Sequence, residues 1–394
     1  MSPATRSIPA RERRARLVRR HHLHGPAAGV AGAARDLVGL HSTDAASVYL
    51  AARARVRGFA AGDLEAALYD DRTLVRVLGM RRTMFVVPVD LAPVVHGACT
   101  RALARRERKR TIAFVEDGGV ARNGAAWLER VEAETLAALE ELGEATAVEL
   151  SRLIPELRKK IPVGAGTKWE GEIGVSTRVL FLLANDGRIV RARPRGSWLS
   201  TQYRWAPMSA WLGTEVDTMP EDEARTRLAG LWLGSFGPGT VDDLKWWTGW
   251  TVAQTRAALA AAGAAEVTLD EGTGYVLAGD VEPVRSPRGA RAALLPALDP
   301  TVMGWTRRDW YLGEHRAALF DRNGNAGPTV WWDGRVVGGW AQRPDGEVAV
   351  RLLEDAGRDA RAAVDAAADE VREWLGDVRV TPRFRTPLER ELSA

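Results

Sequence analysis

Residues 73–87 of the 394-residue chain read Thr-Leu-Val-Arg-Val-Leu-Gly-Met-Arg-Arg-Thr-Met-Phe-Val-Val. Apolar and β-branched residues flank a short turn that contains Gly79, and this pattern predicts a β-hairpin. Upstream, residues 9–24 are typical of a basic helix, and apolar residues recur at helical spacing at 32–40, 43–51 and 63–68. Helices followed by a two-stranded ribbon are the element order of a winged helix, so the sequence predicts one here.

The same order of elements recurs in two further modules. Each module carries a predicted capping box, beginning at Thr146 and at Thr240, with an acidic residue three positions later. The spans 143–150 and 237–244 align without a gap, which indicates a weak internal repeat at matching places. Two more hairpins are predicted from the strand-like runs at 189–192 with 199–205 and at 267–269 with 275–277.

From about residue 288 the pattern changes to short apolar runs separated by Asn-Gly and Asp-Gly turns. Such runs predict a small antiparallel β-barrel, with a long acidic helix at 355–375 and a closing strand at 378–380. The predicted fold is therefore α+β, with three tandem winged-helix modules in a C-shaped arc and a C-terminal antiparallel β-barrel. The predicted domains are 1–120, 121–212, 213–287 and 288–394.

The composition, with 46% hydrophobic and 27% charged residues, excludes global disorder and a collagen-like repeat. No apolar run approaches the roughly 18 residues of a transmembrane helix, and the basic N-terminus lacks the apolar segment of a secretory signal. The single cysteine, Cys99, excludes an internal disulfide. These features predict a cytoplasmic protein, which we expect to be a monomer. Because no metal spacing, P-loop or dinucleotide fingerprint is found, we expect neither a metal nor a cofactor.

The net charge of +4 is distributed unevenly along the chain. Residues 1–110 hold 21 basic and 9 acidic residues, whereas the remainder holds 34 and 42, so the N-terminal part is expected to face a polyanion. Winged helices place a helix in a DNA groove and a ribbon beside it, although some bind proteins instead. The candidate phosphate contacts, each with simple surface exposure as its alternative, are Arg19, Arg20, Arg81, Arg82, Arg105, Arg106 and Arg108. For the short cluster of His21, His22 and His24, phosphate contact or solvent exposure is expected rather than zinc binding.

Over nearly its whole length the chain resembles the AlkZ/YcaQ-like family of bacterial DNA glycosylases. The resemblance rests on the order and spacing of several motifs, chiefly those at 37–43, 80–87, 237–240, 294–300 and 333–338. It implies tandem winged helices with a C-terminal barrel, and a monofunctional glycosylase that removes alkylated purines, chiefly N7-alkylguanine, from double-stranded DNA. Some members unhook interstrand cross-links or remove bulky genotoxin adducts, in base excision repair or in self-resistance. Such a protein would associate with the nucleoid through its DNA.

N7 alkylation makes the base a cationic leaving group, so the enzyme has only to stabilise an oxocarbenium-like sugar and aim a water. Family members carry Gln-x-Gln or Gln-x-Asp at the turn that does this, and the matching residues here are His41 and Thr43. We expect His41 to aim the water, with help from the Thr43 hydroxyl or the Asp44 carboxylate. The alternatives are a structural His41 and a Thr43 that caps the following helix.

Two residues of the predicted hairpin complete the candidate site. Thr83 follows the arginine pair of the turn, and Phe85 stands where the family usually has histidine. Phe85 is expected to stack or wedge at a distorted DNA site. Two function classes remain open from the sequence, a DNA glycosylase and a non-catalytic winged-helix DNA-binding protein that acts as a regulator or shields lesions.

Overall fold

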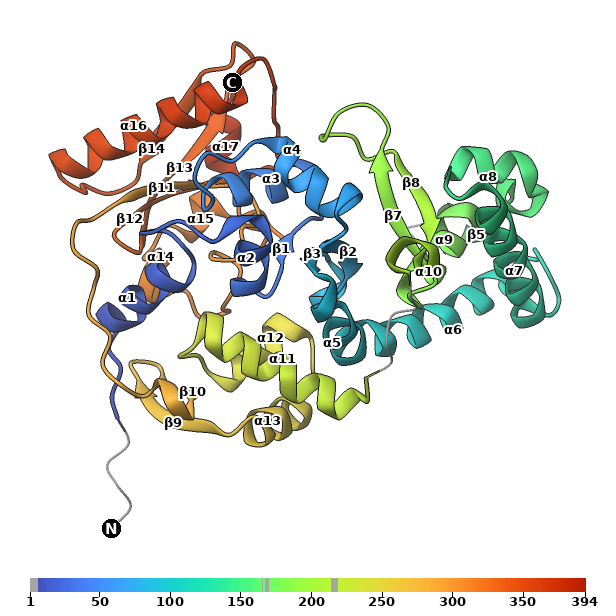
Figure 1. Cartoon of the computed structure of the whole chain (residues 1–394), viewed down its shortest axis with the longest axis horizontal. Coiled ribbons are helices and arrows are strands. Elements are labelled where there is room, and N and C mark those ends of the chain that lie inside the picture. Colours follow the sequence, from blue (N-terminus) through green and yellow to red (C-terminus); the bar gives the residue numbers. More distant parts are fainter. Residues whose placement is uncertain (1–5, 165, 167–169, 214–218) are drawn as a thin grey trace.

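The computed structural model describes residues 6–164, 166, 170–213 and 219–394. In the first region the predicted hairpin forms, because β2 (Leu74–Leu78) pairs antiparallel with β3 (Met84–Pro88). A short strand, β1 (Leu40–His41), pairs with the other edge of β3, which gives the sheet order β1-β3-β2 (Figure 1). The helices of this first region are α1 (Ala10–Arg20), α2 (Gly29–Asp36), α3 (Ala45–Arg53), α4 (Ala61–Glu65), α5 (Ala92–Val95) and α6 (Arg101–Asp117), with short helical turns at Ala66–Asp70, Met80–Arg82, Val89–Leu91 and His96–Thr100.

The turn between β2 and β3 has an unusual backbone. Arg81 and Arg82 have φ angles of 53° and 63°, in the left-handed region that non-glycine residues seldom adopt. A Cβ atom on Gly79 would lie 2.9 Å from a methyl carbon of Val95, so the close approach of the turn to the helix requires glycine. The turn is therefore fixed by packing and projects two arginines from the sheet.

The second region forms most of a separate lobe (Figure 1). Its predicted capping box is confirmed, since Thr146 and Glu149 exchange side chain to backbone hydrogen bonds at 3.2 and 2.7 Å. The predicted hairpin is also present, and a further pair of strands, β5 and β6, pairs antiparallel with Lys160 opposite Gly174. The elements are α7 (Gly124–Leu142), β4 (Ala145–Thr146), α8 (Ala147–Leu153), a turn at Pro155–Arg158, β5 (Lys160–Val163), β6 (Gly171–Gly174), α9 (Val175–Asn185), β7 (Ile189–Pro194), β8 (Tyr203–Pro207) and α10 (Met208–Leu212).

The third region has the predicted order of helices and a hairpin. Thr240 and Asp243 form the second capping box, with the Asp243 amide donating to Thr240 Oγ1 at 3.1 Å. The sequence predicted the paired strands β9 and β10, which align from Ala264 opposite Leu277. The elements are α11 (Glu221–Phe236), α12 (Val241–Thr248), α13 (Val252–Ala261), β9 (Ala264–Leu269), β10 (Gly272–Leu277) and a turn at Ala278–Asp280. The number of winged helices and their arrangement in an arc stay predictions.

The predicted closed barrel is wrong for the described residues. The C-terminal strands form an open antiparallel sheet in the order β11-β12-β13-β14, and residues 378–380 join no strand. Instead, the side-chain amide of Gln342 donates to the Val378 carbonyl at 3.0 Å and accepts from the Val380 amide at 2.8 Å. The long helix α16 packs on β11 and β14. The elements are β11 (Ala292–Leu295), α14 (Asp309–Leu312), α15 (Arg316–Leu319), β12 (Thr329–Trp332), β13 (Arg335–Gln342), β14 (Val348–Leu352), α16 (Arg358–Leu375) and α17 (Pro387–Leu392).

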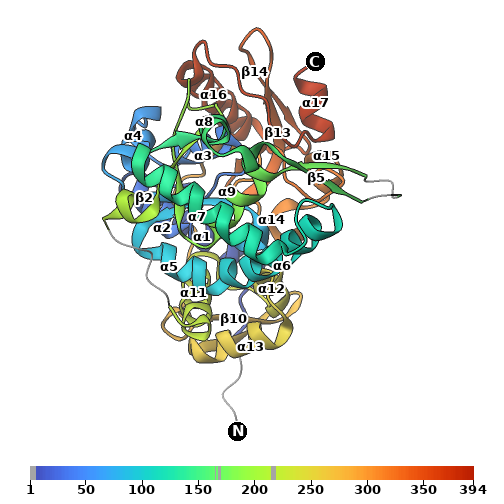
Figure 2. The same cartoon turned by 90° about the vertical axis from the view of Figure 1, so that its right-hand side faces the viewer.

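Two large hydrophobic cores explain the shape of the molecule. The larger core joins the first, third and C-terminal regions, and β7 and β8 reach it through Val190 and Ala206. A second core, which includes Leu128 and Val179, holds the lobe of α7, α8 and α9 together. Figure 2 views the molecule from the side of this lobe, which lies in front of the main body. The strands β2 and β7 therefore meet where the lobe joins the body.

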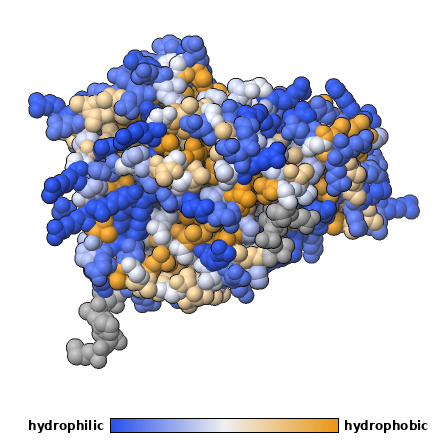
Figure 3. All heavy atoms as spheres, viewed as in Figure 1, coloured by the Kyte–Doolittle hydropathy of each residue, from blue (hydrophilic) through white to orange (hydrophobic). Residues whose placement is uncertain are grey.

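Hydrophilic residues cover most of the face seen in Figure 3, with apolar residues in smaller groups between them. Among the described helices, none combines the length and the apolar character needed to cross a membrane.

Candidate functional site

The turn from His41 to Asp44 connects β1 to α3 and lies against the hairpin. The Ser42 amide donates to the Met84 carbonyl at 2.8 Å, and Thr43 Oγ1 accepts from the Met84 amide at 3.1 Å. These two bonds extend the pairing of β1 with β3 by two residues. The backbone of the turn is thereby held rigidly on the sheet.

His41 is buried, with 3% of its surface exposed. Its ring lies edge-on to Phe85, its partner on β3, at 5.1 Å between centroids. Burial, followed by the nearby charge of Arg81, lowers the pKa of His41 to about 3. The imidazole is therefore neutral at physiological pH, and its Nδ1 accepts the Thr43 amide at 3.5 Å.

Asp44, rather than Thr43, caps the following helix. Its Oδ1 accepts from the amides of Ala46 and Ser47 at 2.9 and 3.2 Å, and Oδ2 accepts from the Arg383 amide at 2.6 Å. The side chain is buried and both oxygens are occupied by backbone donors. This geometry gives Asp44 a structural role and leaves the Thr43 hydroxyl as the outward-facing group of the turn.

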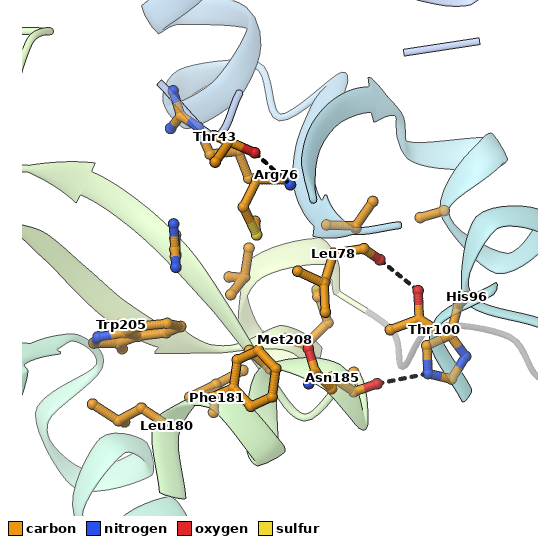
Figure 4. A pocket seen from close by; sticks show the side chains of 18 of the residues that line it. Thr43, Arg76, Leu78, His96, Thr100, Leu180, Phe181, Asn185, Trp205 and Met208 are labelled. Carbon is orange, nitrogen blue, oxygen red and sulfur yellow. Dashed lines mark hydrogen bonds between the residues drawn. The ribbon is translucent and has the colours of Figure 1, made fainter. Parts of the chain in front are cut away.

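Thr43 lines two cavities between the first sheet and the sheet of β7 and β8. The first cavity, of about 390 Å³, is shown in Figure 4; it is largely apolar, with side chains from both sheets and from α9. The second, of about 520 Å³, shares Arg191, Trp205 and Arg383 with the first and is also lined by Ser42 and Tyr203. His41 and Asp44 line neither cavity.

Arg76 is the buried cation of this site, with 5% of its surface exposed. Its Nε donates to Ser42 Oγ at 2.9 Å, and a second guanidinium nitrogen donates to the Tyr69 hydroxyl. Both partners are neutral, and no carboxylate forms an ion pair with Arg76 within the described residues. A guanidinium without a counterion beside a cavity is suited to an anionic ligand.

The other predicted DNA-contact residues differ in whether the structure leaves them accessible. Arg81 lies over the Trp246 ring at 3.8 Å, while Arg82 is about half exposed and reaches Glu107 at 3.4 Å. Thr83 donates through Oγ1 to the Met80 carbonyl at 2.8 Å, which stabilises the turn. Phe85 is 4% exposed and belongs to the main core, so in this structure it is not available to wedge between bases.

The predicted basic helix, α1, presents little of its charge to solvent. Arg19 is exposed, but Arg20 forms an ion pair with Asp280. Further along the chain, Arg105 pairs with Glu221, and Arg108 pairs with Glu132 and Asp186. Arg106 is exposed.

Of the histidine cluster, His21 is fully buried, with Nδ1 2.9 Å from Thr301 Oγ1. His22 contacts the Asp36 carboxylate at 2.7 Å, and His24 contacts the carbonyls of Arg288 and Gly289. The expectation of solvent exposure or phosphate contact is therefore wrong for His21. Its ring fits the core because two neutral oxygens satisfy both ring nitrogens.

Sequence reasoning missed the residues that β7, β8 and the C-terminal segment bring to the cavities, chiefly Arg191, Tyr203, Trp205 and Arg383. One signal was present, since Arg191 lies in the predicted strand run at 189–192 and Arg193 and Arg195 follow at alternate positions. Of these three arginines, Arg193 pairs with Asp70 and lines neither cavity. No group of three or more metal-ligating side chains is found in the part of the chain that the structure describes.

Comparison with known proteins identifies the class. Residues 34–374 match the model of the AlkZ-like DNA glycosylase family, and the chain belongs to this family. A solved structure of similar fold is the DNA glycosylase AlkZ of Streptomyces sahachiroi, with a TM-score of 0.70 and 22% identity over 95% of this chain and 98% of that one. A search of curated proteins found no match. The protein is thus a DNA N-glycosylase with DNA as its partner, and the alternative of a non-catalytic binding protein is set aside.

Proposed function

We propose that this glycosylase hydrolyses the N-glycosidic bond of alkylated purines, N7-alkylguanine first among them, at the turn of His41 and Thr43. The single observation that carries the proposal is the place of Thr43, at the junction of two cavities in a chain of this family. N7 alkylation puts a positive charge on the base, which then leaves without protonation. The protein has only to hold the sugar and a water in line.

We propose that the Thr43 hydroxyl binds the attacking water and that the neutral imidazole of His41 holds the Thr43 backbone in place. The Thr43 oxygen accepts a hydrogen bond from Met84 and can still donate its own proton to a water in the cavity. The neutral His41 ring is buried outside both cavities and accepts the Thr43 amide, so it acts as a positioning residue that fixes the turn. Water is the nucleophile in this scheme, because no lysine is among the described residues that line either cavity.

The test is single-turnover release of N7-methylguanine from an oligonucleotide duplex. Wild type is expected to leave an abasic site without cutting the strand, as a monofunctional enzyme does. His41→Ala and Thr43→Ala are each expected to slow release by roughly 10²-fold or more, the usual scale for a lost acid–base or positioning group.

Arg130→Gln is the control, because Arg130 is half exposed on α7 and lines neither cavity. It is expected to release the base at the wild-type rate. Wild-type rates in both alanine variants would refute the assigned roles, and release of no alkylated purine by wild type would refute the substrate class.

A further inference from the structure

The two cavities beside Thr43 bring four arginines together without a counterion. Arg76, Arg191, Arg195 and Arg383 line them, and the lining residues include no aspartate or glutamate. None of the four forms an ion pair within the described parts of the chain, whereas Arg130 on α7 pairs with Glu134 and Glu156. A concentration of like charge that the protein leaves unpaired marks a place for an anion.

The guanidinium groups of Arg76 and Arg191 are held by neutral groups that leave their charge in place. Arg76 is fixed by Ser42 and Tyr69, as described above. Arg191 lies over the rings of Tyr203 and Trp205, at 5.1 and 5.4 Å from their centroids. Burial lowers the pKa of Arg191, and the charges of Arg76 and Arg383 lower it further against the opposing effect of Tyr203. An anion between these groups would relieve the repulsion.

The four arginines differ in how far an anion must enter to reach them. Arg383 and Arg195 are exposed at the surface, whereas Arg191 is half-buried and Arg76 is nearly inaccessible. A phosphate on the outside of an intact duplex meets only the first two. A phosphate that follows a nucleotide rotated out of the helix reaches the inner pair, and the Trp205 ring at the junction offers a surface on which its base stacks.

We infer that these four arginines bind backbone phosphates of DNA, the outer pair on any duplex and the inner pair only on the strand whose nucleotide has left the helix. The inference rests on the proposed function, since it places the extruded nucleotide next to Thr43. The ligand class is a phosphodiester, because guanidinium groups bind phosphate oxygens through two parallel hydrogen bonds. Arg191 and Arg76 are then positioning residues that favour the extruded state.

The experiment measures binding by fluorescence anisotropy at several salt concentrations. Two probes are used: an intact duplex, and the same duplex with one tetrahydrofuran abasic analogue, whose backbone is extruded at little cost. Arg383→Gln is expected to weaken binding to both probes about tenfold and to reduce the salt slope by about one. Arg191→Gln is expected to weaken only the binding of the abasic probe, also about tenfold.

Arg191→Lys and Arg130→Gln are the controls. Lysine keeps the charge, so its salt slope on the abasic probe is expected to match wild type. Arg130 is half exposed on α7 and paired with Glu134 and Glu156, so its removal is expected to leave both affinities unchanged. The inference is overturned if Arg191→Gln binds both probes as wild type does, or loses the same factor on both.

Binding is read without any base release, so the two proposals fail separately. If the binding pattern is as expected but the protein releases no N7-methylguanine, the phosphate site is supported and the proposed substrate is refuted. If the protein releases the base but Arg191→Gln binds both probes as wild type does, only the phosphate site is refuted.

Discussion

His41 shows how burial changes the chemistry expected from residue type. A free imidazole has a pKa of about 6.5, and a catalytic base of that kind would lose activity as the pH falls through this value. In the folded chain the pKa is about 3, so the neutral form persists far below physiological pH. We therefore expect base release to be independent of His41 protonation from about pH 8 down to about pH 5.

The same shift predicts a pH-dependent stability. Between about pH 6.5 and pH 3 the unfolded chain binds a proton at His41 that the folded chain does not, so the free energy of unfolding falls as the pH is lowered. Each pH unit in this range costs about 1.4 kcal/mol. His41→Gln, which carries the family's usual residue, removes this contribution.

Denaturant unfolding of wild type and His41→Gln at about pH 7 and about pH 5 measures the effect. We expect wild type to lose about 2 kcal/mol more than the variant over this interval. Equal losses in the two proteins would mean that His41 is accessible to protons in the folded state. The buried His21, whose pKa is also lowered by burial, is common to both proteins and cancels in the difference.

At the scale of elements, the sequence predicted the features that depend on residues close together in the chain. The three hairpins and both capping boxes formed because turn residues, β-branched runs and caps act within a few positions of one another. The closing strand at 378–380 was mispredicted, because its backbone is bound by the side chain of Gln342 instead of a neighbouring strand. Within the site, Thr43 was named from the sequence, whereas Arg76 was not proposed as a site residue. Arg383 was not named either, since only the tertiary fold brings it beside α3.

The helix α1 illustrates why a basic stretch is a poor guide to a binding face. Arg16 is 1% exposed, forms ion pairs with Glu12 and Asp280, and donates to the Glu282 carbonyl at 2.7 Å. Arg13 likewise pairs with Glu271. Acidic residues around β9 and β10 thus neutralise much of the positive charge that the sequence assigned to a DNA surface.

This arrangement predicts opposite results for two arginines on one helix. Arg16→Ala is expected to lower the free energy of unfolding by about 2 to 3 kcal/mol, below the upper range for buried pairs because Asp280 is 26% exposed. Its DNA affinity, measured where the variant is folded, should be unchanged. Arg19→Ala should leave stability within about 0.5 kcal/mol and weaken duplex binding with a smaller salt slope. If Arg16→Ala weakens DNA binding while stability is retained, α1 binds DNA through its packed face.

At the scale of the whole molecule, the structure shows what the motif at 294–300 does: it supplies Asp299 to a buried ion pair. The motif marked the resemblance to the family, yet its Asp299 lines neither cavity and holds the C-terminal region to the first region. Asp299 receives two hydrogen bonds from Arg55, at 2.7 and 2.8 Å, and both side chains are completely buried. Arg55 also donates to the carbonyls of His21 and Ala51 and to Thr301 Oγ1. Every N–H group of the Arg55 guanidinium thus donates a hydrogen bond inside the protein, where an unpaired charge is most costly.

Breaking this pair is expected to destabilise the whole main body. Asp299→Asn keeps the shape and an acceptor for the Thr301 amide, which Asp299 Oδ1 binds at 2.9 Å, but leaves the Arg55 charge buried alone. The expected cost is about 3 to 5 kcal/mol in the free energy of unfolding. In the double variant Arg55→Met with Asp299→Asn, no unpaired charge remains, so the loss should be smaller than the sum of the two single losses. A double-mutant cycle by denaturant unfolding measures this coupling, and strictly additive losses would contradict it. Base release below the unfolding transition should stay at the wild-type rate in Asp299→Asn, because the pair lies in the core and lines neither cavity.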